Sequence, residues 1–281
     1  MSTLANLNGA RMLNKVPKVT VEFWLIKLLA VTVGETAADY MNLDLGLGLS
    51  TTSWILAVVL AAALVLQFAQ KKYVPWIYWV SVVLISVVGT LVTDNMVDNF
   101  GITLATSTIF FTVALSATFA VWYGFEKTLS IHTIFTTRRE AFYWLAILFT
   151  FALGTAAGDL VAEGFGLGYL ETGLIFGGLI AVVAFAYYVL KIDGILGFWL
   201  AYILTRPLGA SFGDLFSQPS DHGGLGFGTT NTSFSFIAAI AALIVYLTLS
   251  HHDEDEPVEV TGDVDNILSS DPTTLPDTVE E

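Results

Sequence analysis

Four aspartates recur at the end of a short glycine motif, and carboxylates can bind cations or carry protons. Each motif has the pattern Gly-x-x-x-small-Asp, and the four copies end at Asp39, Asp94, Asp159 and Asp214. Threonine and serine residues flank the motifs, and carboxylate and hydroxyl oxygens suit hard cations such as Na⁺, Mg²⁺, Ca²⁺ or Mn²⁺. The pattern predicts a shared carboxylate site for a metal ion or a proton. The alternative is that the aspartates are only hydrated ends of helices.

Two of the four motif copies carry further charged residues inside apolar segments. Glu35 lies four residues before Asp39 and therefore on the same helical face. Lys27 precedes it by two turns, and Arg206 lies eight residues before Asp214. We expect Lys27 and Arg206 to pair with Glu35 and the aspartates and to offer a proton relay. For Lys27 the alternative is that its amine extends to water at the nearer membrane face.

The motif glycines have a simpler role, because small residues let membrane helices approach closely. Glycine opens all four motifs and fills the small position in two of them, and these residues are predicted to be packing positions: Gly34, Gly89, Gly154, Gly158, Gly209 and Gly213. A second glycine follows seven residues after each of the first three aspartates, and in the fourth copy Gly224 or Gly226 takes that place.

The spacing of the motifs indicates two successive duplications. Gly34 and Gly89 are 55 residues apart, as are Gly154 and Gly209, and the two pairs are offset by 120 residues. A two-helix unit doubled to four helices and then to eight explains both intervals. Since each unit crosses out and back, the four copies are expected to be parallel, with the motif-bearing helices innermost.

The elements that position these motifs are apolar. The chain has 281 residues, of which 55% are hydrophobic and 13% are charged, against about 25% charged in a soluble domain. A membrane-spanning helix needs about 20 apolar residues. The stretches that approach this length are 21–42, 52–69, 74–97, 103–124, 141–162, 171–190, 194–216 and 233–250.

Basic residues predict the orientation and the division of the chain. Lysine and arginine lie in the segments before and between these stretches that share one side, which favours cytoplasmic termini in a bacterial inner membrane. We expect a cytoplasmic segment 1–19, two four-helix halves at 20–129 and 130–250, and a disordered cytoplasmic tail at 251–281. The tail holds 11 of the 25 acidic residues.

Several function classes are excluded or disfavoured. The chain has no cysteine, no phosphate-binding glycine loop, no paired-histidine zinc motif and no basic stripe for nucleic acid. We therefore expect no cofactor and no enzymatic activity. The expected partners are the lipid bilayer and a cation, and a homo-oligomer is left open.

Two segments carry a resemblance. TRPLGASFGD at 205–214 and GETAAD at 34–39 resemble a bacterial family known as uncharacterised membrane-anchored or integral membrane proteins, over about residues 18–250. The repeated Gly-Asp motifs also resemble those of some cation exporters. The resemblance implies an all-α integral membrane protein but carries no activity. We expect eight transmembrane helices in four parallel two-helix repeats, forming a cation transporter or channel. The alternative is a non-transporting scaffold or sensor whose acidic tail contacts a partner.

Overall fold

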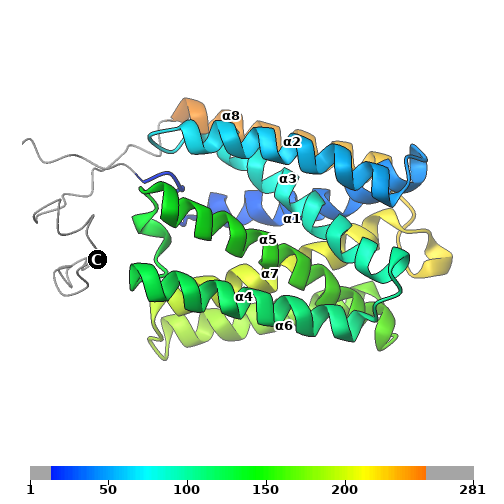
Figure 1. Ribbon diagram of the computed structural model, residues 1–281. Coiled ribbons are helices and arrows are strands. Elements are labelled where there is room, and N and C mark those ends of the chain that lie inside the picture. The colour runs from blue at the N-terminus through cyan, green and yellow to red at the C-terminus, as the bar shows by residue number, and fades with distance from the viewer. Residues whose placement is uncertain (1–13, 251–281) are drawn as a thin grey trace, which may run out of the picture.

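The computed structural model describes residues 14–250, and this part of the chain is helical, with no strand (Figure 1). Residues 1–13 of the predicted N-terminal segment and the whole predicted tail, 251–281, lie outside it. The α-helices are α1 (Val21–Asp39), α2 (Leu49–Ala69), α3 (Pro75–Asp94), α4 (Leu104–Glu126), α5 (Thr137–Asp159), α6 (Tyr169–Tyr188), α7 (Gly194–Ser217) and α8 (Thr229–Ser250). They correspond one to one with the eight predicted stretches.

Three of the motif-bearing helices continue beyond their aspartate in a wider coil. A five-residue π-helical segment follows α1, α3 and α5, and these segments are η1 (Tyr40–Asp44), η2 (Asn95–Asn99) and η4 (Leu160–Gly164). In α7 the aspartate lies inside the α-helix, which continues through Pro207 and ends at Ser217. In three of the four copies, the aspartate therefore lies where the α-helix changes to a π-helix. Short π-helical segments are rare and often mark functional sites.

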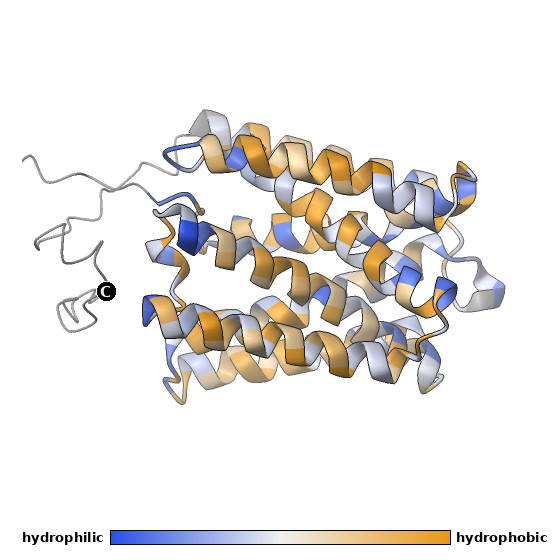
Figure 2. Cartoon of the chain, in the orientation of Figure 1, coloured by the Kyte–Doolittle hydropathy of each residue, from blue (hydrophilic) through white to orange (hydrophobic). Residues whose placement is uncertain are grey.

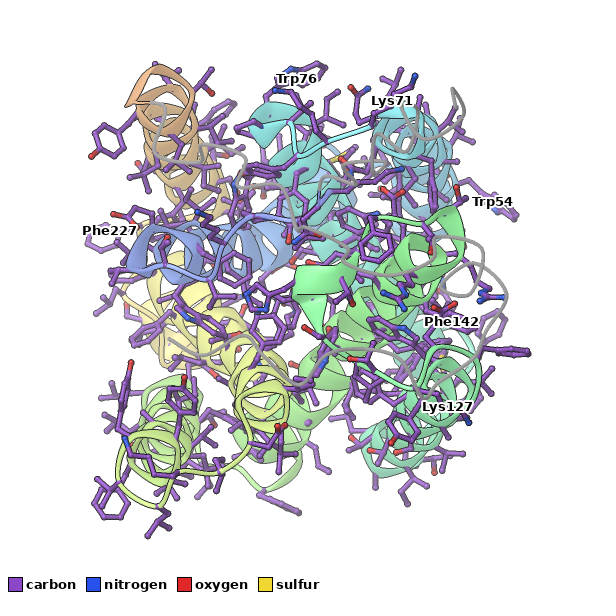
Figure 3. All side chains as sticks on the ribbon, turned by 90° about the vertical axis from the view of Figure 1, so that its left-hand side faces the viewer. Trp54, Lys71, Trp76, Lys127, Phe142 and Phe227 are labelled. Atoms are coloured by element: carbon purple, nitrogen blue, oxygen red, sulfur yellow. The ribbon has the colours of Figure 1, made fainter. Side chains whose placement is uncertain are left out.

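The motif-bearing helices form an inner ring. α1 packs against α3 and α7, and α5 packs against the same two helices. Each outer helix packs against the inner helix of the next repeat: α2 against α3, α4 against α5, α6 against α7, and α8 against α1. The view along the bundle in Figure 3 shows this arrangement, with Trp54 and Trp76 directed away from the ring. The four repeats are therefore interlocked in a closed circle.

The surface of the bundle suits lipid. Seven helices of the described chain are long and apolar enough to cross a membrane, and the ring helices among them are far more buried than the outer helices. Hydrophobic residues cover most of α2, α4 and α6 (Figure 2). The one helix outside this group, α1, carries Glu22, Lys27, Glu35 and Asp39. The protein is thus an all-α membrane protein, and the charged residues of its eight helices lie mainly on the inner helices.

The backbone of the loops after the inner helices shows which glycine, Gly224 or Gly226, is the equivalent residue in the fourth motif copy. Gly46, Gly101 and Gly166 have φ values of 63°, 67° and 67°, and each lies three residues before the next outer helix. Gly226 has a φ of 74° and lies three residues before α8, whereas Gly224 is not among the glycines with positive φ. Left-handed backbone is a conformation that glycine adopts without strain, so Gly226 is the equivalent residue.

Candidate functional site

The motif glycines hold the inner ring together in a repeating contact. Each packs against the residue that lies three positions before the motif glycine of the next ring helix, and an added Cβ would lie 1.9–2.7 Å from that side chain. The contacts are Gly34 with Ser86, Gly89 with Phe151, Gly154 with Arg206, and Gly209 with Val31. No side chain fits at that distance, so the predicted packing role of these four glycines is confirmed. The ring has an approximate fourfold repeat in its contacts as well as in its sequence.

The two glycines at the small position make looser contacts. A Cβ at Gly213 would lie 3.2 Å from Glu35 Cβ, and a Cβ at Gly158 would lie 3.4 Å from Pro207 Cβ. The second distance is close to ordinary van der Waals contact. Gly154 and Gly158 lie on the same helix and face adjacent residues of α7. The contact of Gly154 is tight and that of Gly158 is loose, so substitutions at the two positions can be compared.

One side chain of the ring reaches all four inner helices. Arg206 occupies the position that is Val31, Ser86 or Phe151 in the other repeats, and its side chain has no exposed area. Its Nη2 donates to Glu35 Oε2 at 2.8 Å, to Thr155 Oγ1 at 2.7 Å and also to Thr90 Oγ1.

Carbonyl oxygens accept the remaining donors of Arg206. Its Nη1 donates to the Val31 carbonyl at 3.2 Å, and its Nε donates to the Phe151 carbonyl at 3.4 Å. The predicted pairing of Arg206 with Glu35 is confirmed, and an arginine with all its nitrogens bonded is firmly held.

The groups around this guanidinium are equivalent in the repeat. Glu35, Thr90 and Thr155 each follow a motif glycine directly, and the fourth such residue is Ala210, on the same helix as Arg206. Three repeats thus supply an acceptor and the fourth supplies the donor. The ion pair therefore lies where the four inner helices meet.

Lys27 does not join this ion pair. Its amine has no exposed area, donates to the Tyr202 carbonyl at 2.9 Å and to Thr205 Oγ1, and lies 3.9 Å from the centre of the Tyr202 ring. Within the described residues Lys27 forms no salt bridge, so its predicted pairing with Glu35 or the aspartates is wrong. It does not extend to water either. Carbonyl, hydroxyl and aromatic partners hold the amine instead.

The four aspartates lie one turn beyond Glu35, toward the end of the bundle that is opposite the termini. Asp214 is 9% exposed, and the other three are partly buried. Gln218 Nε2 donates to Asp39 Oδ2 at 3.2 Å. Within the described chain, no lysine or arginine forms a salt bridge with any of them. Glu35 is near enough to interact electrostatically with all four, and Arg206 is near enough to attract Asp159.

These carboxylates do not form a ready-made metal cage. Among residues 14–250, no three histidine, aspartate or glutamate side chains are grouped so that they could hold a metal ion. A hard divalent cation takes about six or more oxygen ligands, so the arrangement is better suited to a proton or to a cation that keeps much of its water.

The sequence reasoning missed two sets of residues. An aromatic residue followed by tryptophan precedes every motif glycine by 11 and 10 residues, and the pairs are Phe23-Trp24, Tyr78-Trp79, Tyr143-Trp144 and Phe198-Trp199. The Tyr78 and Tyr143 hydroxyls lie 2.5 Å apart in the core. The intervals that revealed the glycines, 55 and 120 residues, would also have revealed these pairs.

Buried carboxylates at the end where the termini lie were also missed. Glu140 has no exposed area and pairs with Lys15 at 2.7 Å. Glu126 pairs with Arg139 at 2.6 Å and with Arg138. Their partners come from separate segments of the chain, and no short motif links them.

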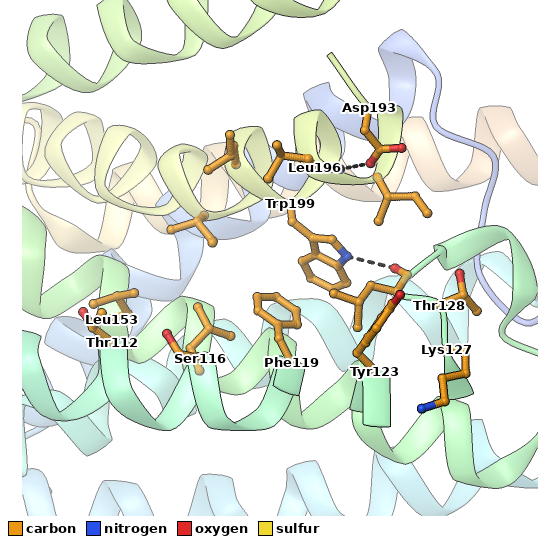
Figure 4. Close-up of a pocket in the computed structure, with 15 residues that line it drawn as sticks. Thr112, Ser116, Phe119, Tyr123, Lys127, Thr128, Leu153, Asp193, Leu196 and Trp199 are labelled. Atoms are coloured by element: carbon orange, nitrogen blue, oxygen red, sulfur yellow. Dashed lines mark hydrogen bonds between the residues drawn. The ribbon is translucent and has the colours of Figure 1, made fainter. Parts of the chain in front are cut away.

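Two cavities lie away from the aspartates. One of about 590 Å³ lies mainly between α4 and α7 and is lined by apolar residues such as Phe119 and Trp199, whose Nε1 donates to the Leu129 carbonyl at 2.9 Å (Figure 4). A second, of about 800 Å³, lies between α1, α6 and α7 and includes Thr205. No predicted charged site residue lines either cavity.

A closed ring of four inner helices, each covered by an outer helix, defines a polytopic helical membrane protein with a fourfold internal repeat. The chain belongs to the family Repeat of Unknown Function (DUF347), which matches residues 23–73, 77–128, 142–193 and 197–253. Each match holds one inner helix and the outer helix that follows it. This supports the expected uncharacterised repeat family. No curated protein and no solved structure matches the chain.

Proposed function

We propose that the protein transports a cation across the bacterial inner membrane, with Glu35 and the four motif aspartates as the groups that receive it. The observation that carries the proposal is that these carboxylates gather at one end of the ring and that none of the aspartates forms a salt bridge in the described chain, although Arg206 attracts Asp159 from a greater distance. Carboxylates within membrane segments are costly. A bound cation or proton supplies the missing compensation.

The arrangement favours a proton or a monovalent cation over a hard divalent metal. Glu35 is a single carboxylate with Arg206 already on one oxygen, and one proton or one monovalent ion can compete with that guanidinium. Proton coupling needs only carboxylates that can change their charge. The aspartates would collect the ion, and Glu35 would pass it toward the ring.

The proposal includes the topology of the chain. All eight helices span the membrane as four parallel two-helix repeats, and both termini lie in the cytoplasm, where the basic loops favour them. α1 spans in spite of its charges, because Lys27 and Glu35 are buried in the ring and do not face lipid. The aspartates then open toward the outer side of the membrane.

Ion flux in proteoliposomes tests the proposal. Asp94→Asn and Asp159→Asn keep the size of the side chains and remove the charge, so we expect each to lower proton or cation flux at least about tenfold. Asp98→Asn is the matched control, because Asp98 lies at the same end but is exposed. Flux that is equal in the wild type, both variants and the control would exclude a carboxylate mechanism.

The alternative function is a membrane scaffold or sensor that transports nothing. It depends on the acidic tail at 251–281, which lies outside the described residues. Absence of flux for every cation tested, together with normal folding of the aspartate variants, would favour this alternative.

A further inference from the structure

We infer that Arg206 is a plug that closes the centre of the inner ring between the aspartates and the level of Lys27. The inference deepens the proposed function and rests on it for the ion that passes. The closure itself follows from geometry and can be tested without measuring transport.

The guanidinium lies where the four inner helices meet. It bonds to α1 through Glu35, to α3 through Thr90 and to α5 through Thr155, and it is carried by α7. These acceptors hold equivalent places in the repeat, so a group bonded to all three lies between the helices and not beside any single one. No apolar residue at this position could make these three bonds.

The exposure of the ion pair differs on its two sides. The Glu35 side chain is 9% exposed, whereas Arg206 has no exposed area. Glu35 also interacts with all four aspartates. The carboxylate is therefore the reachable half of the pair, and the sealed guanidinium lies behind it.

A closed layer of buried side chains lies behind the plug. Seven residues before each motif glycine are Lys27, Val82, Ile147 and Tyr202, and none is more than 1% exposed. Arg206 lies four residues beyond Tyr202 on α7, which corresponds to about 6 Å along a helix. Asp214 lies eight residues further, or about 12 Å. An ion leaving the aspartates meets Arg206 before it reaches this layer.

The bonds of Arg206 also indicate how the plug is released. Glu35 Oε2 accepts from Arg206 and from Thr90. A proton or monovalent cation that binds this oxygen neutralises the carboxylate and removes the ion pair. The guanidinium then keeps only hydroxyl and carbonyl acceptors, which hold it less strongly than a carboxylate, so its movement away from the centre becomes easier.

Labelling of single cysteines tests the closure, because the chain has no cysteine of its own. The reporter is Val82→Cys, in the closed layer. In lipid nanodiscs, a small charged methanethiosulfonate reagent should label it slowly while Arg206 is in place. In the Arg206→Gln background we expect labelling at least about tenfold faster. Leu56→Cys, which is buried on α2, should stay slow in every background.

A second variant removes the plug without removing the charge. Gly154→Ala places a Cβ 2.2 Å from Arg206 Cγ and 2.4 Å from Arg206 Cβ, so α5 and α7 must move apart and shift Arg206, whereas Gly158→Ala meets Pro207 at 3.4 Å. We expect faster labelling of Val82→Cys with Gly154→Ala and no change with Gly158→Ala. Equal labelling rates in folded Arg206→Gln or Gly154→Ala and in the parent would overturn the inference. Faster labelling without any ion flux would uphold the plug and overturn the transport proposal.

Discussion

The two ends of the bundle treat their buried carboxylates in opposite ways. At the end where the termini lie, Glu140 pairs with Lys15 and Glu126 pairs with Arg139. At the opposite end, none of the four equivalent aspartates forms a salt bridge in the described chain, and the nearest ion pair is that of Glu35. The chain therefore neutralises its buried carboxylates with lysine or arginine at the end where they stabilise the fold.

This difference is informative because the chain has basic residues that could have paired with the aspartates. The chain has 11 lysine and arginine residues, and the loops beside the aspartates contain none. Uncompensated charge near a membrane lowers stability, and its repetition in all four repeats is the reason for the proposal that the aspartates receive an ion. The predictions below compare the two ends, in order of the expected effect.

The largest difference should be between Glu140→Gln and Asp159→Asn. Loss of the Glu140 charge leaves the buried Lys15 amine with the Phe68 carbonyl and no counter-charge, and breaking a buried pair costs about 3–5 kcal/mol. Asp159→Asn removes an unpaired charge and should leave the free energy of unfolding unchanged or raised. Equilibrium unfolding in mixed micelles measures both. Equal destabilisation by the two variants would contradict the comparison.

A smaller difference is expected within the paired end. Arg138 and Arg139 both pair with Glu126, but their side chains are 55% and 7% exposed. Arg139→Gln should lower the free energy of unfolding by about 2 kcal/mol, since it removes a buried charged hydrogen bond. Arg138→Gln should lower it by about 1 kcal/mol at most. The reverse order would show that burial does not decide the strength of these pairs.

The smallest effect should come from Gln218→Leu, which removes the hydrogen bond to Asp39. The bond is 3.2 Å long and only partly buried, so it should contribute at the low end for a bond to a charged group, about 1.5 kcal/mol or less, and unfolding and ion flux should both change little. Gln70→Leu is the control, because Gln70 donates to the Leu66 carbonyl on the other side of the bundle. A large loss of flux with Gln218→Leu alone would mean that Asp39 depends on this amide.

The sequence predicts the helices, the inner position of the motif-bearing helices, the glycine packing and the pairing of Arg206 with Glu35. The first three follow from patterns local to one helix or repeated at fixed intervals, and the last follows from opposite charge in apolar segments. The partner of Lys27 was not predictable in this way, because charge favours a carboxylate and only the fold places Tyr202 beside it. The π-helical segments were also missed, since they lack a distinctive residue pattern.

The order of the outer helices was not predictable either. Neighbouring helices in sequence are expected to pack together, but α2 is the sequence neighbour of both α1 and α3, and the two-helix repeat suggests α1 as its partner. Instead α2 covers α3, and α8 returns to cover α1. Short loops permit either arrangement, and the apolar faces of the outer helices do not distinguish between the inner helices.

The interlocked covering bears on how such a chain could have arisen. In a half-length chain ending near residue 129, α1 would lack α8, the outer helix that covers it. The outer helix α4 would lack α5, the inner helix against which it packs. Two such chains side by side would each cover the other's first helix and close the ring. The present protein is in effect a dimer whose two copies have been joined into one chain. Co-expression of the separate halves 1–129 and 130–281 should therefore reassemble the bundle, whereas either half alone should not be stable.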